Sequence, residues 1–191
     1  MTRWLPAACV LAALVTSACG DPPSKEMDQA QGAIDAARAA GADRYATVEY
    51  AAATDALKRS QDAVAQRDYR LALNEALDSR EHAQNAAREA ADNKAQARGE
   101  VERDMAQIAA LIAGANTRLA AAARARVPRQ LLLDQRAELA AVDMSVQKAG
   151  EAIKAGDYLS AKAALQGVNE RIQKATAALA ARTTQSSRRG R

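Results

Sequence analysis

The sequence predicts an all-α protein made of two tandem three-helix bundles. Its 191 residues are dominated by alanine, contain no phenylalanine, and include only 9 glycines and 4 prolines. This composition favours helices and offers little aromatic material for a sheet. Apolar residues also recur at alternating steps of three and four, which is the pattern of amphipathic helices packed side by side. The pattern of the first half returns 89 residues later, so we expect an internal duplication.

The helices of the first bundle can be placed from their end signals. We expect the first helix over residues 24–40, where a glycine follows it. Thr47 is the N-cap candidate of the second helix, and Glu49 in its first turn complements the helix dipole. Asp68 is the N-cap candidate of the third helix. We therefore expect residues 25–97 to form the first bundle.

The second bundle is expected over residues 98–182. Pro128 suits the first position of a helix, because its missing N–H would have no partner there. Gly156 suits the left-handed position after a helix, and Asp157 is the N-cap candidate of the next one.

The stretch 69–126 is expected to be one long helix shared by both bundles. It contains no proline and only two glycines, Gly99 and Gly114. The alternative is a kink near Gly99, where the apolar positions step by four twice in succession.

Two sets of apolar positions carry the expected duplication. The first copy has Tyr50, Ala53, Leu57, Ser60 and Val64, then Ala72, Ala76, Ser79, Ala83, Ala86 and Ala90; the second has Leu139, Val142, Val146, Ala149 and Ile153, then Ala161, Leu165, Val168, Ile172, Ala175 and Leu179. Each methylene missing from a buried side chain removes about 0.8 kcal/mol of transfer free energy. Because the first copy replaces aliphatic residues by alanine and serine, we expect its bundle to be thinner and less stable.

The first residues read as an export signal that ends at Cys19. Arg3 precedes an apolar run over residues 5–15, which is too short to cross a bilayer. Small residues then lead into Cys19, and this pattern resembles the lipobox of bacterial lipoproteins. The resemblance implies that residues 1–18 are cleaved, that Cys19 carries the lipid, and that residues 19–24 form a tether. The alternative is an ordinary signal peptide that contains a cysteine by chance.

A second resemblance covers residues from about 30 to 97. The sequences that carry it are Tyr45-Ala46, then Ala53, Leu57 and Ala63, then Asp68-Tyr69-x-x-Ala72; the second copy has Gly156-Asp157-Tyr158. These motifs resemble a helical domain of unknown function in alanine-rich lipoproteins of Gram-negative bacteria. Some relatives also carry a peptidoglycan-binding domain like that of outer membrane protein A, which nothing in this chain matches. The resemblance implies no enzymatic activity.

The formal charge of +4 comes mainly from one end of the chain. Residues 183–191 are polar and rich in arginine, and we expect them to form a disordered basic tail. The rest of the mature chain is close to neutral, which argues against nucleic acid as a partner.

No set of residues predicts a catalytic, cofactor or metal site. His82 is the single histidine, and we expect it to be a surface residue paired with Asp78 one turn earlier. The acidic clusters at residues 75–81 and 100–104 are interleaved with arginines, which is typical of solvated helix faces. Tyr69 and Tyr158 sit at matching turns, where they either stabilise the turn or contact a partner. We therefore expect no enzyme, and no cofactor besides the lipid on Cys19.

The sequence thus predicts a non-catalytic, lipid-anchored helical spacer or adaptor of the cell envelope. Gly20 after the cysteine resembles the signal that permits sorting to the outer membrane, so we expect the chain there, facing the periplasm. The alternative location is the outer face of the inner membrane. Expected partners are the membrane, through the lipid, and an envelope protein or peptidoglycan. The alternative function is a periplasmic binding module that holds an apolar ligand or peptide, with the alanine-rich first bundle as its site.

Overall fold

The computed structural model describes residues 21–189, with side chains described as far as residue 182. Every regular element in that range is an α-helix. The all-α class is therefore confirmed. The chain divides into two units between Asn93 and Lys94.

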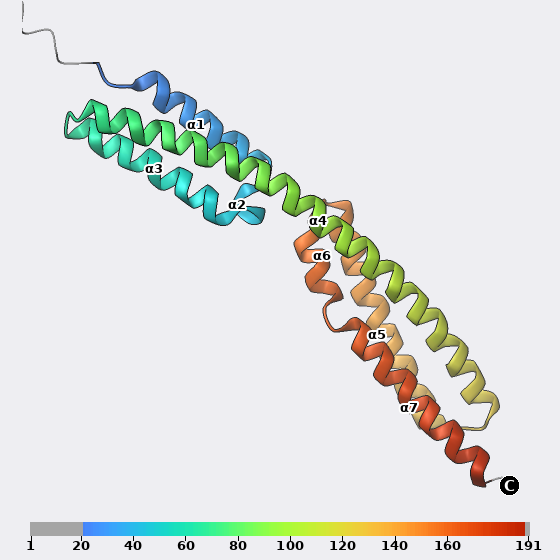
Figure 1. Ribbon diagram of the computed structural model, residues 1–191. Helices are drawn as coiled ribbons and strands as arrows, with labels where there is room; N and C mark the ends of the chain where they lie inside the picture. Colours follow the sequence, from blue (N-terminus) through green and yellow to red (C-terminus); the bar gives the residue numbers. More distant parts are fainter. Residues whose placement is uncertain (1–20, 190–191) are drawn as a thin grey trace, which may run out of the picture. The chain divides into compact units, whose positions relative to one another are not determined.

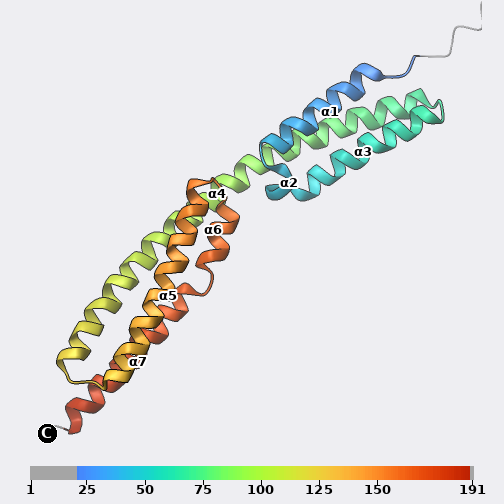
Figure 2. The same ribbon diagram turned by 180° about the vertical axis from the view of Figure 1, so that it is seen from behind.

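Unit 1 consists of three helices and the first part of a fourth. These are α1 (Ser24–Ala39), α2 (Ala42–Tyr45), α3 (Thr47–Ala65) and α4 (Tyr69–Arg124) as far as Asn93. α1 and α3 lie alongside this part of α4, while α2 is a single short turn between them (Figures 1 and 2). The first helix ends as expected, with Gly41 in the left-handed region at a φ of 89°.

The core of unit 1 is built from small side chains. Its fully buried positions are mostly alanines, including Ala30, Ala37, Ala53, Ala56, Ala72, Ala76, Ala83, Ala86 and Ala90. Two serines lie among them: the hydroxyl of Ser60 donates to the carbonyl of Ala72 at 2.7 Å, and that of Ser79 donates to the carbonyl of Ala53 at 2.8 Å. Both hydroxyls therefore have partners although both residues are completely buried.

Unit 2 consists of the rest of α4 with α5 (Arg129–Lys154), α6 (Tyr158–Leu165) and α7 (Val168–Arg189). Its core is one continuous cluster of aliphatic residues, among them Val101, Ile108, Val142, Ile172 and Leu179. The burial of Val142, Ile172 and Leu179 confirms apolar positions predicted on α5 and α7. Larger side chains fill this unit than fill unit 1.

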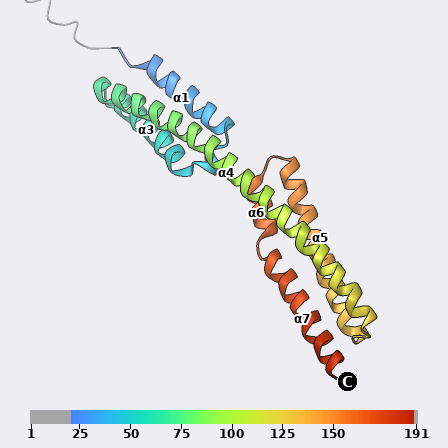
Figure 3. The same ribbon diagram turned by 45° about the vertical axis from the view of Figure 1, so that its right-hand side comes forward.

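The last predicted helix is broken into α6 and α7, although its apolar pattern continues across the break. Leu165 and Val168 are both buried and keep helical spacing, yet α6 ends at Leu165 and α7 begins at Val168 (Figure 3). Gln166 is extended, with φ −60° and ψ 129°, and Gly167 has a φ of 73°. A glycine accepts this left-handed conformation without steric cost, which explains the position of the break.

The cap predictions are partly right. Asp68 accepts a hydrogen bond from the N–H of Leu71, and Asp157 accepts one from the N–H of Ser160, each at 3.0 Å. Thr47 does not cap α3; it is the first helical residue, because the chain enters the helix at Ala46. Likewise Pro128 takes the N-cap position of α5 instead of the first helical position.

Three helices end in the same left-handed turn. Arg67, Arg126 and Gly156 have φ values of 60°, 56° and 72°. After α5, the N–H of Gly156 bonds to the carbonyl of Ile153 and the next N–H reaches back to Ala152, as in a Schellman motif. Arg67 and Arg126 adopt this left-handed turn although they carry side chains. Of the three residues, only Gly156 is of the type that adopts it without steric cost.

Two further observations concern the long and the last helix. α4 runs without interruption through Gly99, so the expected single helix is confirmed and no break occurs there. α7 continues to Arg189, which differs from the disordered tail expected over residues 183–191. That stretch has neither glycine nor proline before Gly190, so nothing in it stops a helix.

Candidate functional site

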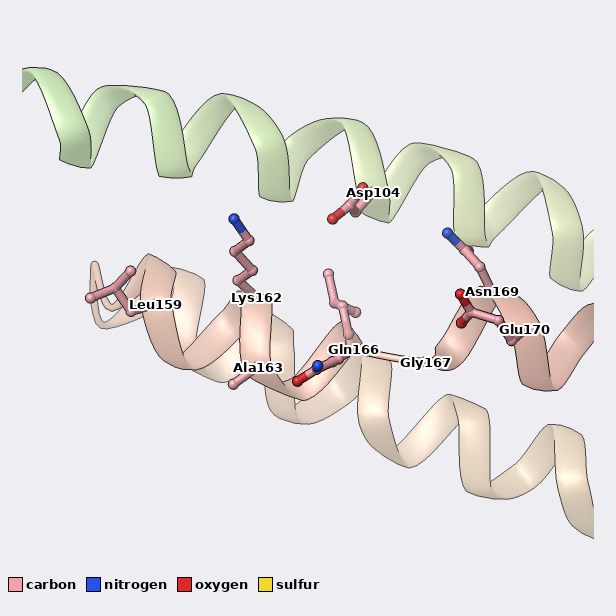
Figure 4. Close-up of a pocket in the computed structure, with 9 residues that line it drawn as sticks. Asp104, Leu159, Lys162, Ala163, Gln166, Gly167, Asn169 and Glu170 are labelled. Atoms are coloured by element: carbon pink, nitrogen blue, oxygen red, sulfur yellow. The ribbon is translucent and has the colours of Figure 1, made fainter.

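Unit 2 contains a hollow of about 480 Å³ between α4 and the junction of α6 with α7. The break at Gln166 and Gly167 shapes one side of it, because the extended backbone there replaces a helical turn. Asp104 projects into the hollow from α4, and Lys162 projects from α6 towards α4 (Figure 4). Gln166 at the break and Asn169 and Glu170 in the first turn of α7 complete the polar lining.

An ion pair joins α4 to α6 beside the hollow. Lys162 Nζ donates to Glu100 Oε2 at 2.6 Å, and Gln96 Nε2 donates to the other carboxylate oxygen at 3.2 Å. The hydrogen bond from Lys162 is the main reason why the pKa of Glu100 is lowered. The same bond, seen from the other partner, raises the pKa of Lys162. The positive charge of Lys162 is therefore already matched by Glu100.

The two other carboxylates of the hollow have no such partner. Among the described residues, neither Asp104 nor Glu170 forms a hydrogen bond or an ion pair within 4.0 Å. The charge of the half-buried Asp104 nevertheless acts on Lys162, where it helps to raise the pKa of the amine. A third acceptor, Asn169 Oδ1, is buried and has no donor among these residues. Gln166 and Asn169 also carry amide N–H groups, so the hollow offers both donors and acceptors.

The rest of the lining is apolar. Leu159 is 37% exposed at one end of the hollow, and Leu165 and Ala163 lie along the α6 side. No histidine, cysteine, serine or threonine lines the hollow. Across the described residues there is also no group of three or more His, Cys, Asp or Glu side chains arranged to hold a metal ion.

Apart from Asp104, the residues singled out from the sequence lie outside the hollow. Cys19, the expected lipidation site, falls outside the described residues. His82 does not pair with Asp78; its Nδ1 lies 2.8 Å from Glu49 Oε2, so the contact joins α4 to α3. The pairing could not be read from helical spacing because the two residues are 33 positions apart.

In the two acidic clusters Glu75, Glu100 and Glu102 form ion pairs, but their partners are not the arginines interleaved with the clusters. Glu75 binds Arg59 of α3 at 2.8 Å, and Glu102 binds Arg98 within α4 at 2.7 Å. Tyr158 packs against the core of unit 2, whereas Tyr69 is half-buried at the start of α4. Among the helices of the described part, none is both long and apolar enough to span a membrane.

A family model described as Domain of unknown function (DUF4398) matches residues 25–101. That stretch is a DUF4398 domain. The DUF4398 domain includes α1, α2, α3 and the first part of α4, and therefore all the described helices of unit 1. All the residues that line the hollow lie beyond it, from Asp104 onward. Comparisons with curated proteins and with solved structures found no match.

The hollow could not be predicted from the sequence. Asp104 belongs to the acidic cluster at residues 100–104, and Lys162, Asn169 and Glu170 belong to no recognisable motif. The available signal was Gly167, a glycine inside an otherwise regular helical pattern, which can mark a break.

Proposed function

We propose that the chain is a non-catalytic, lipid-anchored helical spacer or adaptor of the bacterial cell envelope. The observation that carries the proposal is Cys19, which follows an apolar run and small residues in the manner of a lipobox. Gly20 after it favours the outer membrane, with the chain facing the periplasm; the outer face of the inner membrane is the alternative. The expected partner is an envelope protein or peptidoglycan.

The beginning of the fold is compatible with such an anchor. α1 starts at Ser24, and residues 21–23 are not helical. Only residues 20–23 would therefore separate a lipidated Cys19 from the first helix. A cysteine with a diacylglycerol and an acylated amino group holds a protein on a membrane stably, since two chains suffice where one is marginal.

We further propose that the two units arose by duplication. The positions 89 residues apart are buried in both units: Ala72 with Ala161, Ala76 with Leu165, Ser79 with Val168, Ala83 with Ile172, Ala86 with Ala175, and Ala90 with Leu179. Asp68 and Asp157, at the same spacing, cap the following helix with the same bond. The two units therefore have buried positions and a capping aspartate at equivalent places in the sequence, although their core side chains differ in size.

The anchor is tested by replacing Cys19. We expect Cys19→Ser to abolish incorporation of radioactive palmitate and to move the protein from the membrane fraction to the soluble periplasmic fraction. The matched control is Cys9→Ser, which alters the other cysteine of the chain and should change neither result. Normal processing and membrane fractionation of Cys19→Ser would contradict the proposal.

The hollow in unit 2 supports the second candidate, a periplasmic module that holds an apolar ligand or peptide. It lies outside the alanine-rich unit, where the small core residues are completely buried. A titration with N-phenyl-1-naphthylamine, whose fluorescence rises in apolar surroundings, tests this candidate. Saturable binding that Leu159→Ser weakens would support it, and a lack of saturable binding would contradict it.

A further inference from the structure

We propose that two copies of the chain associate through an exposed apolar stripe on α5, with the two α5 helices antiparallel. The stripe consists of Leu133, Ala137, Ala140 and Met144. This inference goes beyond the adaptor function, because it adds a second copy of the chain to the expected partners. It rests on residues of unit 2, and none of them belongs to the anchor.

The stripe faces away from the core of unit 2. All four of its residues are exposed, and the two large ones, Leu133 and Met144, are 43% and 71% exposed. Alternating steps of four and three keep the four residues on one side of the helix. At about 100° per residue, that side is nearly opposite the buried residues Leu139, Val142 and Ala149. α5 therefore has two apolar faces, and unit 2 covers one of them.

The stripe is complementary to itself. Read from either end, it presents a large residue, two alanines and a second large residue, at the spacing of a coiled-coil seam. A twofold axis between Ala137 and Ala140 would pack Leu133 of one copy against Met144 of the other. The alanines would meet at the centre, where their small side chains let the two backbones approach closely. Because both copies present the same surface, such an interface closes as a dimer.

The charges beside the stripe favour the antiparallel direction. Arg136 and Asp143 are exposed along the same edge of the stripe, and neither forms an ion pair within 4.0 Å among the described residues. In the antiparallel pair, Arg136 of each copy lies close to Asp143 of the other, which gives two attractive contacts. Glu151 continues the line of the stripe after Met144, so a parallel pair would bring two carboxylates together. In the antiparallel pair, Glu151 lies beyond the start of the other copy's α5.

The test measures self-association of the purified full-length chain by sedimentation equilibrium. Cys9→Ser and Cys19→Ser exclude disulfides and lipid, and a mild detergent whose micelles outnumber the chains covers the apolar run over residues 5–15. A stripe of about three turns makes a small interface, so we expect a dimer whose population rises with concentration. Met144→Glu should raise the dissociation constant at least about tenfold, because it places a charge in the apolar seam. Val48→Glu is the matched control: Val48 is 78% exposed on α3 of unit 1, and its replacement should leave association unchanged.

Charge exchange tests the direction of the two helices. Arg136→Asp should raise the dissociation constant roughly three- to tenfold, because it sets like charges beside each other twice in the dimer. Adding Asp143→Arg to that variant should restore the parent value. A parent chain that stays monomeric up to about 1 mM, an equal effect of Met144→Glu and Val48→Glu, or no restoration by the double exchange would each overturn the proposal. These outcomes are measured without lipid, so they are distinct from failure of the anchor.

Discussion

Lys162 Nζ donates a 2.6 Å hydrogen bond to Glu100 Oε2 and so joins α6 to α4 across 62 positions of sequence. The side chains are 56% and 29% exposed, so salt screens the pair and its contribution to stability is small. Its effect on pH dependence is nevertheless specific, because each partner shifts the pKa of the other.

The Glu100–Lys162 pair should stabilise unit 2 only within a defined pH range. The pKa of Glu100 lies below 4.5 in the folded chain, so its contribution is present above pH 4.5 and is lost as the pH falls through the folded value. The pKa of Lys162 lies above 10.5, so its contribution is present below pH 10.5 and is lost as the pH rises through the folded value. We expect Glu100→Gln to melt at a slightly lower temperature than the parent at pH 7, and this difference to shrink towards pH 3. A difference of equal size at both pH values would contradict the assignment.

Arg67→Gly should stabilise unit 1. Arg67 is exposed and has a φ of 60°, where a side chain costs roughly 1–2 kcal/mol. The greater freedom of glycine in the unfolded chain offsets part of that gain, so we expect a net increase of about 0.5–1 kcal/mol in the free energy of unfolding. Chemical denaturation measures it. The reverse change at the equivalent turn, Gly156→Ala, should destabilise by about 1 kcal/mol, and a stabilising effect there would contradict the argument.

Ser79→Val should destabilise more than Ser79→Ala. The alanine variant loses the bond to the Ala53 carbonyl, which costs about 1 kcal/mol. The valine variant loses the same bond and must also fit extra volume among buried alanines, which adds roughly 1–3 kcal/mol. Hydrogen exchange of unit 1 amides measures both effects. Ser145→Ala is the control, because the hydroxyl of Ser145 bonds only to the Ala141 carbonyl of its own helix; if valine proved better tolerated than alanine, the core of unit 1 would not be closely packed.

Gly167→Ala distinguishes a rigid break from one that can straighten. If the break between α6 and α7 persists in the variant, alanine must adopt a φ of 73°. The free energy of unfolding should then fall by roughly 1–2 kcal/mol while the helix content stays unchanged. Gly150→Ala is the matched control, because Gly150 lies within α5 and a Cβ there meets nothing within 4 Å. That variant should be stabilised by roughly 0.5–1 kcal/mol. Higher helix content in Gly167→Ala, seen by circular dichroism, would mean that α6 and α7 fuse.

The features that could be predicted from the sequence depend on neighbouring residues. Asp68 and Asp157 each cap a helix by accepting a hydrogen bond from the N–H three residues later in the sequence. Gly156 ends a helix because its own backbone adopts the left-handed conformation. The class of the fold followed from spacing that repeats along each helix. The DUF4398 domain was anticipated from motifs of similarly short range.

The features that could not be predicted are contacts between distant segments or choices between similar local structures. Glu49 and His82 meet only because α3 and α4 pack together, and no local pattern connects them. At Gln166 the apolar spacing was compatible with a continuous helix, so burial could not indicate the break. The N-cap of α3 is Ala46, one position before the predicted Thr47, and no local pattern distinguished these two neighbouring positions.

The two buried serines of unit 1 have a consequence for how α3 and α4 align. A face made of alanines is nearly the same after a slide of one helical turn, about 5.4 Å, so packing alone distinguishes such alignments weakly. Ser60 bonds to Ala72 and Ser79 bonds to Ala53, and in each pair the two residues lie equally far before and after Gln66. A slide of part of a turn would leave both hydroxyls buried without a partner, whereas a full turn would offer each of them the carbonyl of a neighbouring turn. These serines thus restrict the two helices to alignments spaced by whole turns and disfavour the positions between them.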